Sequence, residues 1–229
     1  MTSVASHIYG IRERLPAGVE LVAVSKWQTN ETIMEAYRAG QRHFGENRAQ
    51  EFAEKEALLP KDIVWHFIGH LQTNKVKMVV GKAELIHSID SERLLLAVEE
   101  EAKKQGIVQR CLLQLHIAME ESKSGFSQEE LSAFLKTPEF CSLQAVQICG
   151  IMGMASFVSD EQQIRAEFHS LKRYYNQLQQ SIFANHPHFC HLSMGMSGDW
   201  LIAVEEGSTL IRVGTQIFAG VAPTPPLYP

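Results

Sequence analysis

The chain has 229 residues, of which 45% are hydrophobic and 21% charged, and its net charge is -5 at pH 7. These values are typical of a folded globular protein and exclude disordered and fibrous classes. No apolar run is long enough to span a bilayer, and the N-terminal residues lack the apolar core of a signal peptide. We therefore expect a cytoplasmic protein that does not contact membranes. Lys and Arg form no basic stripe, so nucleic acid is not an expected partner.

The predicted elements begin with a helix over residues 3–14 and continue with short β-rich runs that alternate with helical periodicity. Eight runs are predicted to be strands, at residues 20–26, 42–45, 64–69, 85–90, 111–117, 147–154, 191–197 and 209–215. This alternation is typical of a parallel sheet whose strands are connected by crossover helices.

The strongest helix signal between the strands lies at residues 91–105, where Ser91 can cap an apolar stripe and Gly106 can end it. Residues 159–184 carry the longest helical pattern. Shorter helices are expected after Asn30, Asn47, Leu71, Ser127 and Gly198. The tail at residues 221–229 holds four of the eight prolines, so it cannot sustain a helix.

Eight strand and helix steps in about 220 residues predict a (β/α)8 TIM-like barrel, an α/β fold. The barrel is expected to occupy residues 1–220 as a single domain with an extra N-terminal helix. An open doubly wound sheet is the alternative, because it needs the same alternation. No GxGxxG motif follows the first strand, and no change of composition marks a second domain.

Lys26 stands at the end of the first predicted strand, on the same side as Val22 and Val24. If that side is the barrel interior, the lysine lies in the mouth where barrel active sites collect. Partial desolvation there would raise the fraction of neutral amine that can attack a carbonyl. A lysine that extends from the strand end into solvent is the other interpretation.

The last two predicted strands carry residues suited to an anion. Arg212 interrupts an apolar run, and a buried arginine needs a polar partner. Gly214 and Thr215 follow it, and Ser193 begins a segment of small and hydroxyl residues at 193–198. Loops after strands seven and eight of a barrel frequently bind phosphate, although simple tight turns would also use these glycines. Together with Lys26, this set matches the aldehyde, phosphate and ring nitrogen of pyridoxal 5′-phosphate (PLP).

Five segments of the sequence are similar to one known family. They are AVSK at 23–26, HFGENRAQE at 43–51, WHFIGHLQTNK at 65–75, SMGMSGDW at 193–200 and IRVGTQIF at 211–218. In these segments, and in their order, the chain closely resembles the YggS/PROSC family of pyridoxal-phosphate homeostasis proteins. The sequence departs from the family pattern at two points, since Ala219 and Gly220 follow Phe218 and His116 replaces a frequent asparagine.

The resemblance implies a fold like the barrel domain of alanine racemase, which is fold type III of PLP proteins, and a cofactor held as a Schiff base on Lys26. It also implies that Ser193, Gly214 and Thr215 hold the phosphate, that Arg212 meets the pyridine nitrogen and that Asn47 lies beside the ring. The implied function is not catalytic. It is that of an intracellular carrier and reservoir of vitamin B6 with effects on amino-acid balance.

Two alternative functions use the same residues. A racemase-like enzyme needs an acid and a base on opposite faces of the substrate carbon, and in the racemases resembled here one of them is a tyrosine from a second domain. An arginine at the ring nitrogen would also weaken PLP as an electron sink, so little turnover is expected. In the third hypothesis, Lys26 attacks a substrate directly and the phosphate cradle holds that substrate. The expected partners are PLP and the apo-enzymes that would receive it, and the chain itself is expected to be a monomer.

The remaining reactive residues are predicted to be structural. The cysteines show no CxxC spacing and are interpreted as small buried hydrophobic residues rather than a disulfide framework. They are Cys111, Cys141, Cys149 and Cys190. His66 and His70 are interpreted as core or turn histidines, and the run at residues 186–191 fits no common zinc pattern, so no metal is expected. The loop at residues 120–125 is assigned no role.

Overall fold

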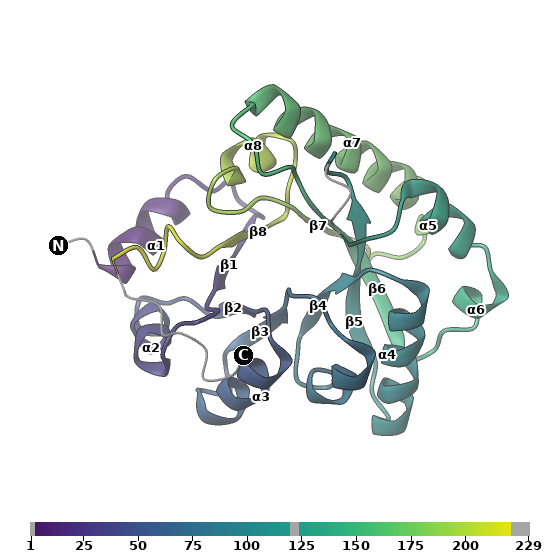
Figure 1. The fold of residues 1–229 in the computed structure, drawn as a ribbon, viewed down its shortest axis with the longest axis horizontal. Helices are drawn as coiled ribbons and strands as arrows, with labels where there is room; N and C mark the ends of the chain where they lie inside the picture. The colour runs from purple at the N-terminus through teal and green to yellow at the C-terminus, as the bar shows by residue number, and fades with distance from the viewer. Residues whose placement is uncertain (1–2, 120–123, 221–229) are drawn as a thin grey trace.

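The computed structural model describes residues 3–119 and 124–220 and forms a closed barrel of eight parallel strands, in the order β1 to β8, with helices around it (Figure 1). The strands are β1 (Glu20–Val24), β2 (His43–Glu46), β3 (Val64–Phe67), β4 (Leu85–Ile89), β5 (Gln109–His116), β6 (Val146–Met154), β7 (His191–Ser193) and β8 (Leu210–Val213). The predicted barrel is confirmed. The open sheet is wrong, because β8 pairs with β1 and places Leu210 opposite Glu20.

Six of the eight strands end earlier than predicted at the C-terminal mouth of the barrel, and β1 and β7 are two of them. β1 stops at Val24 instead of Lys26, and β7 stops at Ser193 instead of Ser197. After β1 the chain turns at once, since the amide of Gln28 donates to the carbonyl of Ser25 at 3.0 Å. Lys26 and Ser197 therefore lie on loops that rise from the strand ends, where a barrel presents its functional groups.

The helices are α1 (Val4–Arg12), α2 (Asn30–Arg38), α3 (Ala49–Leu58), the 3-10 helix η1 (Thr73–Met78), α4 (Glu92–Gln105), α5 (Gln128–Phe134), α6 (Pro138–Cys141), α7 (Glu161–Gln180) and α8 (Trp200–Glu205). The predicted limits of α4 are confirmed, because the Ser91 hydroxyl accepts from the amide of Leu94 and Gly106 has a φ of 66°. The helix predicted over 159–184 is α7, which begins only after the capping Asp160. A 3-10 helix forms after Leu71, and α6 was not predicted.

The alternation of side chains along the strands divides the apolar residues between two clusters. The larger cluster, which includes Leu21 and Ala23, lies between the strands and the surrounding helices. The smaller one fills the barrel interior and consists of Val22, Leu85, Leu112, Cys149, Met152 and Leu210. Because Val22 faces the interior, the same alternation directs Lys26 toward the barrel mouth rather than toward the helices.

Two of the four cysteines differ from their prediction. Cys111 and Cys149 are buried as expected, but Cys141 and Cys190 are exposed, because one ends the short surface helix α6 and the other lies in the loop before β7. None of the four forms a disulfide in the described residues. The loop residues 120–123 and the tail 221–229 lie outside the described part of the chain.

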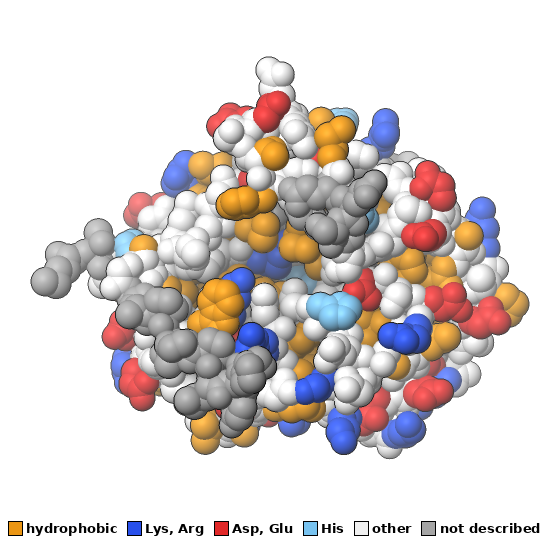
Figure 2. All heavy atoms as spheres, viewed as in Figure 1, with side chains coloured by type: hydrophobic (Ala, Val, Ile, Leu, Met, Phe, Trp, Pro, Cys, Tyr) orange, Lys and Arg blue, Asp and Glu red, His pale blue; other side chains and the backbone are white. Residues whose placement is uncertain are grey.

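The molecular surface carries mixed charge. On the face shown in Figure 2, Lys and Arg side chains are interspersed with Asp and Glu side chains. Within residues 3–119 and 124–220, no helix combines the length and apolar character that crossing a membrane requires. The predicted functional residues are therefore expected at the barrel mouth, where the C-terminal ends of the strands meet.

Candidate functional site

Lys26 lies in a tight turn directly after β1, with its side chain half-buried. The next residue, Trp27, has a φ of 63°, which makes it the one non-glycine residue with positive φ in the described chain. Such a conformation costs about 1–3 kcal/mol and persists only where the surroundings impose it. The Nζ atom of Lys26 lies 4.8 Å from the centroid of the Trp27 ring. The turn therefore places the Lys26 side chain beside the Trp27 ring at the mouth.

Helix α3 anchors both ends of this turn through charged side chains. The Nζ atom of Lys55 donates to the carbonyl of Ser25 at 3.0 Å and to the carboxylate of Glu46 at 2.8 Å. The same carboxylate accepts from the Ser25 hydroxyl at 2.6 Å. On the other side of the turn, the amide of Trp27 donates to the carboxylate of Glu51 at 3.4 Å. The lysine at the mouth thus rests on a buried ion pair.

The buried pair has an unusual electrostatic balance. Burial raises the pKa of Glu46, while the Lys55 ammonium and the Ser25 hydroxyl oppose the shift. Both side chains are nearly inaccessible, and the Oε2 atom of Glu46 has no hydrogen-bond partner among the described residues. A pair of this kind adds little net stability but becomes costly when one member is removed.

Asn47 follows β2 at the same end of the barrel as Lys26, since β1 and β2 are adjoining parallel strands in which Val24 pairs with Gly45. Its Oδ1 atom is buried and has no hydrogen-bond partner among the described residues. Gly69 packs on the Asn47 backbone so closely that a Cβ atom would lie 2.1 Å from its carbonyl oxygen. Only glycine allows this approach, which fixes Asn47 and leaves its amide oxygen for a ligand.

The loops after β7 and β8 meet in a small cradle of hydroxyl and amide groups. The backbone amide of Gly214 donates to the Ser197 hydroxyl at 3.2 Å, and Thr215 is exposed beside it. A Cβ atom at position 214 would lie 3.1 Å from the carbonyl oxygen of Val24, so glycine keeps the end of β8 close to the end of β1. Hydroxyls and a backbone amide of this kind are typical phosphate ligands.

Arg212 lies below this cradle, inside the barrel, and is 4% exposed. Its Nη1 group donates to the Ser193 hydroxyl, and its Nη2 group donates to the carbonyl of Gly153 at 3.2 Å. Burial lowers the pKa of Arg212 to about 10, and the negative charge of Asp199 opposes the shift. The guanidinium therefore stays charged at neutral pH within a largely apolar interior.

The structure brings most of the predicted site residues together. Lys26, Asn47, Gly214 and Thr215 all follow the C-terminal ends of three neighbouring strands, β8, β1 and β2. Ser193 and Arg212 lie deeper, because both are buried inside the barrel, where the Ser193 hydroxyl contacts Arg212 and His87 instead of facing the mouth.

Sequence reasoning missed two residues near the site. The hydroxyl beside Gly214 belongs to Ser197, four residues after Ser193 in the same segment. The predicted strand ran to Ser197, and its true end at Ser193 is what separates the two serines. His87 was missed because it lies in an apolar run, and its pairing with Ser193 bridges 106 positions in sequence.

The other reactive side chains lie elsewhere. His70 is exposed and contacts the Asp90 carboxylate at 2.9 Å, whereas His66 is buried in the barrel. No group of three His, Cys, Asp or Glu side chains suited to a metal occurs in the part of the chain that the structure describes.

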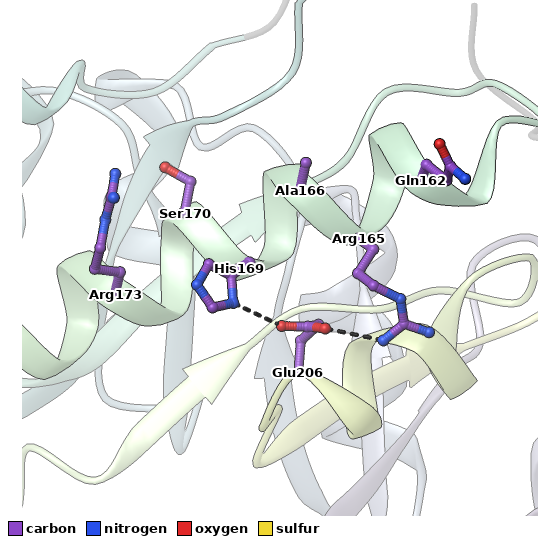
Figure 3. A pocket seen from close by; sticks show the side chains of 7 residues that line it. All are labelled: Gln162, Arg165, Ala166, His169, Ser170, Arg173 and Glu206. Carbon is purple, nitrogen blue, oxygen red and sulfur yellow. Dashed lines mark hydrogen bonds and ion pairs between the residues drawn. The ribbon is translucent and has the colours of Figure 1, made fainter.

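One surface hollow of about 440 Å³ lies along α7 (Figure 3). Two of its lining side chains share one partner, since Arg165 donates to Glu206 at 2.9 Å and His169 lies 3.1 Å from the same carboxylate. No predicted site residue lines this hollow.

Comparison with known proteins gives concordant matches over nearly the whole chain. The family model for the alanine racemase N-terminal domain matches residues 1–222. The pyridoxal phosphate homeostasis protein of Aquifex aeolicus is 40% identical over 200 residues, which cover 87% of this chain and 86% of that protein.

Solved structures agree with these matches. PipY of Synechococcus elongatus, with PLP bound, is 40% identical and has a TM-score of 0.86, covering 95% of this chain and 100% of its own. Alanine racemase of Bartonella henselae is 18% identical, with a TM-score of 0.71 over 99% of this chain and 60% of its own. The likeness to the racemase concerns the fold alone, while the likeness to PipY and to the Aquifex protein extends to the sequence.

Proposed function

The chain belongs to the family of pyridoxal phosphate homeostasis proteins, and we propose that it binds PLP reversibly at its barrel mouth as a carrier and reservoir. The observation that carries this proposal is the convergence of an amine, Lys26, a hydroxyl and amide cradle around Gly214 and a buried guanidinium, Arg212, on the adjoining strands β8 and β1. These three groups match the aldehyde, the phosphate and the ring nitrogen of the cofactor. The solved relative PipY holds PLP.

In this proposal each residue has a separate task. Lys26 forms the Schiff base with the aldehyde, and its orientation is fixed by the strained turn at Trp27. Thr215 and the amide of Gly214 hold the phosphate together with Ser197, which replaces the predicted Ser193. We assign Ser197 because its hydroxyl contacts the Gly214 amide, whereas the Ser193 hydroxyl contacts Arg212.

The ring end of the site is assigned to two further residues. Arg212 meets the pyridine nitrogen, and the unpaired Oδ1 atom of Asn47 lies beside the ring. PLP supplies an aldehyde and an electron-accepting ring when it is bound. A guanidinium that keeps its charge disfavours a proton on the ring nitrogen, so it weakens the electron sink that catalysis would need. This favours storage and delivery over turnover.

The curated relatives are named for homeostasis of PLP rather than for a reaction. We propose that this chain likewise acts in cytoplasmic vitamin B6 balance, as a monomer, with PLP-dependent apo-enzymes as recipients and with effects on amino-acid balance. The alternative is a racemase-like enzyme that uses the same pocket. The two functions differ in whether the loaded protein exchanges the α-hydrogen of an amino acid with solvent.

The first experiment is borohydride reduction of the protein incubated with PLP, followed by mass spectrometry of its peptides. We expect a pyridoxyl-phosphate adduct on the peptide that contains Lys26, and no adduct there in Lys26→Ala. Lys82→Ala is the matched control, because Lys82 is an exposed lysine that precedes β4 at the opposite end of the barrel. An adduct that persists in Lys26→Ala at the same yield would refute the lysine assignment. Hydrogen exchange at the α-carbon of alanine at an enzymatic rate would favour the racemase-like alternative.

A further inference from the structure

Three histidines on successive strands form a hydrogen-bonded line through the barrel interior. The Nδ1 atom of His43, on β2, lies 3.0 Å from Nε2 of His66, on β3. The Nδ1 atom of His66 lies 2.9 Å from Nε2 of His87, on β4. His66 is 3% exposed and His87 is 0% exposed. Three imidazoles in one line are far more polar than the side chains that usually fill a barrel core.

The two ends of this line reach different parts of the protein. At one end, Nδ1 of His87 lies 3.0 Å from the hydroxyl of Ser193, which in turn accepts a hydrogen bond from Arg212. At the other end, Nε2 of His43 lies 3.8 Å from the carboxylate of Glu20, where the two side chains are 29% and 46% exposed. Glu20 and His43 begin their strands, so this end opens to solvent on the face opposite the mouth.

The buried imidazoles are neutral at physiological pH. Burial lowers the pKa of His66 to about 3, and repulsion by His43 and His191, when these are protonated, and by Arg110 acts in the same direction. Burial also lowers the pKa of His87 well below its ordinary value, with further contributions from His66 and Arg212. A neutral imidazole has one N–H group and one lone pair, so each ring donates on one side and accepts on the other.

The direction of the hydrogen bonds follows from Arg212. A guanidinium only donates, so the Ser193 oxygen accepts from it and the Ser193 hydroxyl hydrogen is left for Nδ1 of His87. His87 then carries its hydrogen on Nε2 and donates to His66, and His66 donates from Nε2 to His43. The reverse order would leave the buried Ser193 hydroxyl hydrogen without an acceptor among the hydrogen bonds of the described residues.

We propose that Glu20, His43, His66, His87 and Ser193 form a histidine network that positions Arg212 and stabilises its buried charge from the opposite face of the barrel. Each imidazole and the Ser193 hydroxyl turn their accepting end toward the guanidinium, so their aligned dipoles favour a cation at Arg212. Each ring donates from its Nε2 atom, and the carboxylate of Glu20 lies at the end of the network, beside Nε2 of His43. These five residues are positioning residues, because they act on the cofactor only through Arg212.

The effect of the network on the cofactor rests on the proposed function, but its hydrogen-bond order does not. The order is tested on the unliganded protein by nitrogen-15 NMR of the imidazoles at pH 7. We expect His66 and His87 to be neutral with the hydrogen on Nε2. In Ser193→Ala, His87 loses the donor to its Nδ1 atom and should become a mixture of tautomers. A doubly protonated ring, or hydrogen on Nδ1 in either residue of the wild type, would overturn the proposed order.

The positioning role is tested by PLP affinity in His66→Leu, which interrupts the network far from the mouth. We expect binding about tenfold weaker, the effect of disturbing one hydrogen bond to a charged group. His169→Gln is the matched control, since His169 also contacts a carboxylate but lies on the outer surface of α7. If His66→Leu does not fold, His43→Gln at the half-exposed end replaces it.

The possible outcomes separate this inference from the proposed function. Unchanged PLP affinity in a folded network variant overturns the positioning role. Weaker binding in the network variant, with unchanged binding in His169→Gln, supports it. Wild-type protein that shows the expected tautomers but binds no PLP would refute the proposed function and leave the hydrogen-bond order standing.

Discussion

The buried pair beneath the mouth gives a sharp prediction when its cation is removed. In Lys55→Met, the hydrogen bonds from Nζ to Glu46 and to the carbonyl of Ser25 are lost, while Glu46 stays buried. Breaking such a pair costs about 3–5 kcal/mol, because the remaining group keeps its desolvation penalty. Glu46 can reduce this cost by taking up a proton, since burial already raises its pKa. We therefore expect the lower end of that range.

The cost is measured by urea and thermal unfolding of the purified variants. For a chain of this length, a loss of about 3 kcal/mol should lower Tm by roughly 6–12 °C. The control is Lys61→Met, whose ion pair with Glu56 at 2.9 Å is 69% exposed at the lysine, so its loss should cost less than about 1 kcal/mol. The double variant Lys55→Met with Glu46→Leu removes both charges and should recover most of the stability.

The same variant also tests how the lysine at the mouth is oriented. Because Lys55 holds the Ser25 carbonyl, its loss should loosen the turn and lower the yield of reduced adduct at Lys26 under conditions where the protein is still folded. If Lys55→Met unfolds at the same urea concentration as Lys61→Met, loss of the buried Lys55 cation is no more costly than loss of a surface cation, and the reasoning about the buried pair is refuted.

Three further predictions concern acid stability and the cradle. His66 is neutral in the folded protein and protonates near its ordinary pKa of 6.5 in the unfolded chain. Its full contribution to the free energy of unfolding is therefore present above pH 6.5. That contribution is lost as pH falls toward the folded value of about 3, by about 5 kcal/mol in all, and His66→Gln should flatten this part of the stability profile. Gly214→Ala should weaken PLP binding in equilibrium titrations, since the added Cβ would crowd Val24, whereas Gly198→Ala has open space and should bind normally. Ser197→Ala and Thr215→Ala should each weaken binding by about 1–3 kcal/mol if their hydroxyls bond the phosphate, and wild-type affinity in either variant would remove that residue from the cradle.

Local sequence signals determined the number and order of the strands and the position of most helices. Ser91 and Gly106 mark the two ends of α4, because helix caps depend on backbone groups within a few residues. The period-two pattern of the first strand predicted that Lys26 shares a side with Val22, and the structure shows that this side is the barrel interior. Strand ends were less well defined, since the point at which a strand leaves the barrel depends on its neighbours rather than on its own residues. That is why Ser193 and Ser197 were not distinguished.

Only the tertiary structure decided which polar side chains meet inside the barrel. The contact of His87 with Ser193 joins positions 106 apart, and the buried pair of Glu46 and Lys55 joins a strand to the helix that follows it. Local periodicity indicates which residues of the same strand share a face with His66. It cannot indicate which side chains of other strands lie beside the His66 ring. The register between parallel strands sets those neighbours. The sequence by itself therefore determined the order of the strands and the candidate residues for PLP. The tertiary structure decided that the sheet closes, which candidates lie at the mouth and which are buried beneath it.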